Sequence, residues 1–309
     1  MNMKKIFKAI GLLLTIASLV LVVVEIGKME IDSSLFAGKN LLIFVLFTIG
    51  YTGLVTVLGI PWGAYVKDIT GVKIPFSKLN LIFTKSNLMK YIPGNVFQYV
   101  GRNEIAIDYK LDHRDVVCAT IMDVMSLSLS GLLVAVAFST KGLLTWILQY
   151  ISMPLLILAV IALFAFAAVA ILMVKRIPYF SFLFRKKTIA SLCKGIGLLI
   201  LFHICSAGMF WVTLSYILGA ELGQIGVAAV IGAWCIGYLA GYIVPGAPGG
   251  LGVREITIAF LLSAVADAPM IALGTIFMRV ANILGEVLAF LCALLINLWK
   301  NRGEKKYEE

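Results

Sequence analysis

Two short segments of this chain combine a proline-glycine pair with an arginine at the same spacing. In the first, Pro93-Gly94 is followed by seven residues and then Arg102; in the second, Pro245-Gly246 is followed by seven residues and then Arg254. Proline removes a backbone donor and glycine tolerates turn conformations, so each pair should interrupt a helix. The free N–H groups of the helix that restarts, together with the guanidinium, favour an anionic group such as a phosphate.

The position of each arginine along its segment allows two interpretations. If the restarted helix is continuous, the arginine lies about 14 Å from the proline, and the two arginines sit near opposite mouths of a central site. Alternatively, both arginines extend to the membrane interface and pair with the nearby Glu104 and Glu255. The sequence alone leaves both open.

The composition places these segments in a membrane protein. Hydrophobic residues make up 61% and charged residues 14% of the chain, against about half and about a quarter in soluble domains. The net charge of +10 comes from basic residues that lie in short segments between apolar runs. That distribution follows the positive-inside rule and argues against nucleic-acid binding.

A spanning helix needs about 20 mostly apolar residues, and six stretches meet this length. They are Ile6–Val24, Leu41–Ile60, Val116–Phe138, Pro154–Val174, Ala190–Leu218 and Met270–Leu298. Two further regions, Phe76–Asp108 and Gln224–Ala264, contain the Pro-Gly pairs and should form broken hairpins. We therefore expect an all-α integral membrane protein: a polytopic helix bundle of six full spans and two re-entrant or broken helical hairpins.

The charge distribution predicts the orientation of the bundle. If each hairpin enters and leaves on one side, most of the 26 lysines and arginines face the cytoplasm, as do both termini and the charged tail 300–309. Residues 1–309 then form a single membrane domain of two half-repeats, about 1–150 and 151–300, in opposite orientation. Corresponding Gly/Pro breaks in two such halves are typical of inverted-repeat transporters. Whether the hairpins are re-entrant or cross fully stays open.

Among the polar residues inside predicted spans, Asp123, Arg279, Asn282 and Glu286 are the candidates for a functional role. A charge at the bilayer centre costs about 2.5–3.5 kcal/mol on insertion scales, so the charged members need partners. Arg279, Asn282 and Glu286 share one helical face by their spacing. The structural interpretation pairs Arg279 with Asp123 or Glu286; the functional one has Asp123 or Glu286 carry a proton coupled to transport.

The sequence indicates neither a cofactor nor a metal centre. Its five cysteines form no CxxC pair, and it contains only two histidines. We also find no convincing catalytic constellation, so we expect a protein that is not an enzyme.

The two Pro-Gly segments resemble a known family. KYIPGNVFQYVGR and PGAPGGLGVREI are similar to the two hallmark motifs of the lysylphosphatidylglycerol synthase transmembrane-region family, also called flippase-like domain proteins. The resemblance covers roughly Lys4 to Trp299 and implies a stand-alone member without the soluble aminoacyl-transferase domain of the full-length synthases. In the first motif, Asn95 and Gln98 stand where the family often has an arginine or glutamate, which leaves the head group open.

The resemblance carries the motif positions over as substrate-binding candidates, with Glu104 beside the first motif. These candidates are Pro93, Gly94, Arg102, Glu104, Pro245, Gly246, Gly249, Gly250, Gly252, Arg254 and Glu255.

The sequence thus favours a flippase-like protein of the cytoplasmic membrane. Its expected substrate is an anionic lipid, a phospholipid or a polyprenyl-phosphate-linked glycolipid, in envelope lipid or glycan biosynthesis. Two alternatives remain: a membrane-embedded transferase that uses a lipid-linked donor, and a non-catalytic partner of a glycosyltransferase. Membrane lipids are the expected surroundings in every case.

Overall fold

The structure is a computed structural model that describes residues 20, 37–92, 96–138, 178–220, 222, 224–243, 248–250, 252–263 and 266–306. These residues form helices and no strand, which confirms the all-α prediction for this part of the chain. The predicted spans Ile6–Val24 and Pro154–Val174 lie outside the described residues, apart from residue 20.

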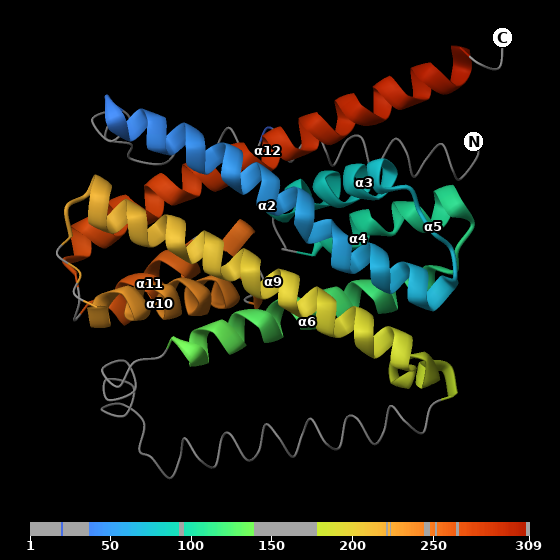
Figure 1. The fold of residues 1–309 in the computed structure, drawn as a ribbon, viewed down its shortest axis with the longest axis horizontal. Coiled ribbons are helices and arrows are strands. Elements are labelled where there is room, and N and C mark those ends of the chain that lie inside the picture. Colours follow the sequence, from blue (N-terminus) through green and yellow to red (C-terminus); the bar gives the residue numbers. More distant parts are fainter. Residues whose placement is uncertain are drawn as a thin grey trace.

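Four helices of the described residues are long and apolar enough to cross a membrane. They are α2 (Lys39–Thr70), α6 (His113–Ala137), α9 (Lys186–Val212) with its π-helical continuation (Thr213–Ile217), and α12 (Ala268–Lys306). A short 3₁₀ helix, η3 (Pro178–Phe184), precedes α9. The four helices extend along the long dimension of the molecule (Figure 1). Large apolar side chains remain exposed on α2 and α6, such as Leu42 and Met125. Several apolar helices with apolar outer faces are what a multi-pass membrane protein requires.

Helix α2 continues well beyond its predicted end at Ile60. Pro61 lies inside the helix, and the helix ends only at Gly71, whose φ of 75° places it in the left-handed region and whose N–H donates to the Lys67 carbonyl. Proline removes one helical hydrogen bond, but Trp62 and Tyr65 in the next turn are fully buried. Their packing holds the helix together past the proline.

Both predicted broken regions are helical hairpins. The first consists of α3 (Phe76–Leu88), η2 (Met89–Tyr91), α4 (Phe97–Arg102) and α5 (Glu104–Tyr109), and α4 packs back against α3. The second consists of α10 (Gln224–Ile243), η5 (Pro248–Gly250) and α11 (Val253–Leu262), and α11 packs back against α10.

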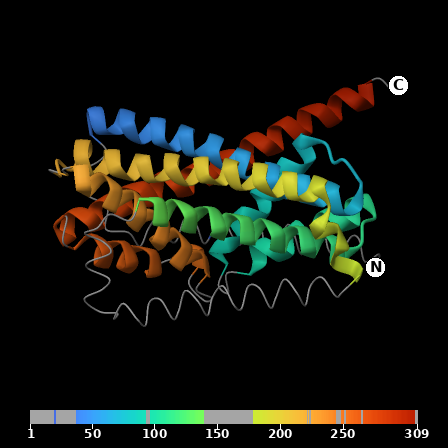
Figure 2. The ribbon, with the colours of Figure 1, turned by 60° about the horizontal axis from the view of Figure 1, so that its bottom comes forward.

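The two hairpins occupy opposite ends of the molecule. In Figure 1, α3–α5 lie toward the right end of the long helices and α10 and α11 toward the left end, and Figure 2 agrees. Their tips meet, because η2 packs against η5. One apolar cluster joins α3 and α5 to α2 and α6, and a second joins α10 and α11 to α9 and α12. Between these clusters, polar side chains are buried.

Candidate functional site

A polar cavity of about 50 Å³ lies where the two hairpin tips meet helix α12. Its lining comes from α2, both hairpins and α12, and comprises Tyr51, Lys90, Tyr91, Gln98, Tyr238, Gly241, Tyr242, Gly249, Arg254, Arg279, Asn282, Ile283 and Glu286. Arg279, Asn282 and Glu286 all line it, as their shared helical face suggests.

Helix α12 holds the tip of the first hairpin through Glu286. This carboxylate is 2% exposed and forms an ion pair with Lys90. Its second oxygen accepts a hydrogen bond from the Tyr91 hydroxyl at 3.0 Å. Lys90 and Tyr91 both belong to η2, so one buried carboxylate fixes the end of this hairpin.

Two turns earlier, α12 holds the second hairpin through Arg279. Its Nη1 donates to the carboxylate of Glu255 in α11, and its Nη2 donates to the Gly249 carbonyl in η5 at 3.3 Å. The predicted pairing of Arg279 with Asp123 or Glu286 is therefore wrong. Each of these three residues instead pairs with a residue of a hairpin: Glu286 with Lys90, Asp123 with Arg102, and Arg279 with Glu255.

Arg254 lies at the beginning of α11, as the second residue of that helix. The prediction of a continuous helix between Pro245 and Arg254 is wrong, because Gly249, Gly250 and Gly252 adopt φ values of 56°, 75° and 77°. These left-handed conformations suit glycine and end regular helix. Arg254 therefore starts the helix beside the cavity instead of lying several turns along it.

Aromatic rings surround the Arg254 guanidinium. No carboxylate of the described residues pairs with it. Its central carbon lies 4.3 Å from the Trp234 ring centroid and 4.7 Å from that of Tyr238. Its Nε and Nη2 are buried and have no hydrogen-bond partner. The predicted pairing with Glu255 is wrong, since Glu255 binds Arg279. Cation–π contacts stabilise the charge but leave N–H donors available.

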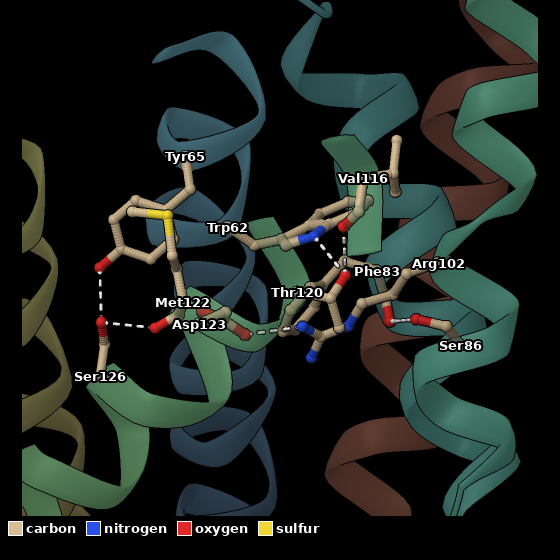
Figure 3. Close-up of polar contacts among 10 residues, drawn as sticks. All are labelled: Trp62, Tyr65, Phe83, Ser86, Arg102, Val116, Thr120, Met122, Asp123 and Ser126. Atoms are coloured by element: carbon tan, nitrogen blue, oxygen red, sulfur yellow. Dashed lines mark hydrogen bonds and ion pairs between the residues drawn. The ribbon is translucent and has the colours of Figure 1, made fainter. Parts of the chain in front are cut away.

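Arg102 has the same kind of aromatic surroundings but a built-in anion (Figure 3). It is the last residue of α4, only 4% exposed, and its Nη1 donates to Asp123 at 2.7 Å. Its guanidinium carbon lies 4.5 Å from the Phe83 ring and 5.6 Å from the Trp62 ring. The predicted pairing of Arg102 with Glu104 is wrong, since Asp123 binds Arg102 and Lys85 binds Glu104.

Helix α6 supports this arrangement with further hydrogen bonds, visible in Figure 3. The Trp62 indole donates to the Thr120 hydroxyl at 3.2 Å, and the hydroxyls of Tyr65 and Ser126 lie 3.0 Å apart. Asp123 lies between these contacts on α6, so neighbouring turns fix the carboxylate in position.

A second cavity, of about 20 Å³, adjoins Arg102 and Asp123. Gln98, Tyr238 and Tyr242 line both cavities, so the two motif arginines face neighbouring polar spaces. The arginines are therefore brought into one polar interior, although they come from opposite hairpins.

The remaining sequence candidates lie elsewhere. Glu104 pairs with Lys85 at 2.8 Å and lines neither cavity. Gly250 packs against the backbone of Gly241, and Gly252 is exposed. Pro93, Gly94, Pro245 and Gly246 lie outside the described residues.

Sequence reasoning missed several lining residues. Lys90 is the first residue of the motif KYIPGNVFQYVGR, but it was not among the predicted site residues. The lining residues Tyr238 and Tyr242 and the Arg254 contact Trp234 recur every four residues in the otherwise apolar α10, a spacing that places them on one face. That aromatic stripe was the available signal.

No family model, curated protein or solved structure matches the chain. The geometry therefore carries the functional argument. It provides a small space in which an amide, several phenols and a guanidinium with no carboxylate partner among the described residues converge, an arrangement suited to binding an anion.

Proposed function

We propose that this chain is a flippase-like protein of the cytoplasmic membrane that binds an anionic lipid and moves it between leaflets. The head group binds in the cavity between the hairpin tips, while the acyl or prenyl chains stay in the surrounding lipid. A phospholipid and a polyprenyl-phosphate-linked glycolipid both fit this class. The motif resemblance to flippase-like domain proteins supports the same function.

The observation that carries the proposal is the state of Arg254. Its Nε and Nη2 are buried and have no hydrogen-bond partner among the described residues, and the residue borders the cavity. Buried donors that lack an acceptor are costly. An anionic head group would supply the missing acceptors. A phosphate suits a guanidinium, because both groups form bidentate hydrogen bonds.

The hairpins supply a route for movement. They approach from opposite ends of the bundle and meet at their tips (Figures 1 and 2). Six spans and two such hairpins in inverted halves would place the site near the midplane, where rocking of one half against the other exposes it alternately. Basic loops on one side put both termini in the cytoplasm.

The test is lipid exchange in liposomes that contain the purified protein. Fluorescent phosphatidylglycerol should redistribute between leaflets with the wild type and about 10- to 100-fold more slowly with Arg254→Gln, the loss expected for charge-assisted hydrogen bonds. Arg114→Gln is the matched control, because Arg114 is exposed and lines neither cavity. It should exchange lipid at the wild-type rate.

Folding must be checked alongside. Arg254→Gln should keep the elution profile of the wild type and lose at most about 2 kcal/mol of stability, since it removes cation–π contacts but no ion pair. A folded Arg254→Gln protein with wild-type exchange would contradict the proposal, as would a wild type that moves no anionic lipid.

A further inference from the structure

The charges around the cavity nearly balance. Three cations, Lys90, Arg254 and Arg279, line it. One carboxylate, Glu286, lines it as well, and a second, Glu255, lies behind Arg279 as its ion-pair partner. Glu286 pairs with Lys90, and Glu255 pairs with Arg279. One positive charge, that of Arg254, remains without a counter-ion among the described residues.

The polar groups near Arg254 add hydrogen-bonding capacity without adding charge. Asn282 is 5% exposed, and neither its carbonyl oxygen nor its amide nitrogen has a hydrogen-bond partner in the described part of the chain. It lines the same cavity as Tyr51 and Tyr238. A ligand here would meet one free cation and a set of neutral donors and acceptors.

The cavity is also small. Its volume of about 50 Å³ is more than the roughly 10–15 Å³ that one water needs. A space of this size suits a single phosphate group. The recognised part of a larger ligand is therefore its charged linkage.

The first hairpin contains an arginine in similar surroundings that neutralises one carboxylate. Arg102 lies over two aromatic rings, as Arg254 does, and binds a single carboxylate, Asp123. That cavity already contains its anion. By comparison, the described residues around Arg254 supply no paired negative charge.

We propose that the cavity selects a lipid-borne phosphodiester, which carries one negative charge, over a phosphomonoester. This inference rests on the proposed function and specifies its substrate class. A phosphomonoester carries about −1.5 to −2 charges at neutral pH. Its second charge would compete with Glu255 or Glu286 for a cation that is already paired, in an interior where excess charge is poorly solvated.

The experiment compares two lipids that differ by one methyl group. Phosphatidylmethanol is a phosphodiester, and phosphatidic acid with the same acyl chains is a phosphomonoester. Exchange by the full chain in liposomes, at about pH 8 where the monoester is a dianion, should favour phosphatidylmethanol by about tenfold, equivalent to one decade of affinity.

Two variants test the charge balance directly. Glu255→Gln removes one carboxylate and should shift the ratio of the two rates toward phosphatidic acid by about tenfold. The double variant Lys90→Gln/Glu286→Gln removes a cation and an anion together, so its ratio should remain that of the wild type even if both rates fall. An unchanged ratio in Glu255→Gln would overturn the inference.

The outcomes separate this inference from the proposed function. Equal exchange of both lipids by the wild type, abolished by Arg254→Gln, would refute the charge selection and leave the flippase function standing. Exchange of neither lipid would refute the function itself. Dimethyl phosphate provides the soluble comparison: inhibition at concentrations matched to the lipid would overturn the assignment to a lipid-borne group.

Discussion

At the level of single residues, the two motif arginines occupy similar surroundings but differ in charge compensation. Both lie over aromatic rings, yet Arg102 has Asp123 as its partner and Arg254 has no carboxylate partner among the described residues. A buried arginine that is already paired contributes to holding helices together, here α4 against α6. We therefore expect substitution of Arg102 to lower mainly stability and substitution of Arg254 to lower mainly lipid exchange.

Replacing Arg102 with leucine should destabilise the protein strongly. It leaves Asp123, 3% exposed, as an unpaired buried charge, which typically costs about 3–5 kcal/mol. Unfolding in detergent, followed by the fluorescence of the tryptophans, measures the effect.

The double variant Arg102→Leu/Asp123→Leu should recover most of that loss, because it removes both charges. If the double variant is as unstable as the single one, the pair does not behave as a mutual neutralisation and the assigned role of Arg102 is wrong.

At the level of elements, the second hairpin depends on close backbone contact between α10 and η5. A Cβ on Gly250 would lie 2.8 Å from the Cα of Gly241, and Gly250 itself has a φ of 75°. Glycine is the residue that fits both conditions. The contact brings η5 against α10 while Arg279 binds the neighbouring Gly249 carbonyl from α12.

Gly250→Ala should therefore weaken the hairpin by more than about 1–3 kcal/mol, the usual cost of a sparsely populated backbone conformation, because a backbone clash is added. Lower thermal stability and slower lipid exchange should appear together. The control is Gly197→Ala in α9, where a Cβ meets nothing within 4 Å; it should change stability by less than about 1 kcal/mol. Equal tolerance of both substitutions would contradict the described packing.

At the level of the whole molecule, α12 connects the two hairpins. Arg279 binds the second hairpin and Glu286 the first, both from one helix face, with Asn282 between them at the cavity. A shift of α12 along its axis would therefore move both hairpin tips at once. This gives the proposed alternating movement a physical connection between its two halves.

The orientation of the bundle is tested by labelling single cysteines in a variant whose five native cysteines are replaced by alanine. Arg114 is the second residue of α6, and Asp267 lies directly before α12. Both residues are exposed. If the basic end faces the cytoplasm, a membrane-impermeant maleimide should label Asp267→Cys on intact cells and Arg114→Cys only after lysis. The reverse pattern would invert the topology, and labelling of both on intact cells would refute the predicted side for Arg114.

Much of the fold could be predicted because it depends on local properties. Apolar length indicates a spanning helix by itself, and four of the predicted spans are helices of the described residues. The hairpin breaks could also be predicted, since Pro and Gly act on their own backbone. The bounds were less accurate: burial of Trp62 and Tyr65 carries α2 through Pro61, and three glycines delay α11 to Val253.

The pairing of charges could not be predicted in the same way. Helical spacing correctly placed Arg279, Asn282 and Glu286 beside one another, but a spacing rule describes only one helix. Their partners come from other elements: Lys90 lies 196 residues from Glu286 along the chain, and Glu255 reaches Arg279 because η5 turns α11 back toward α12. The sequence by itself determined the class of molecule and the positions of its breaks, because hydropathy and backbone preferences are local. Only the tertiary structure decided which arginine is neutralised and which remains available, because a buried charge is compensated by whichever group the packing brings within reach.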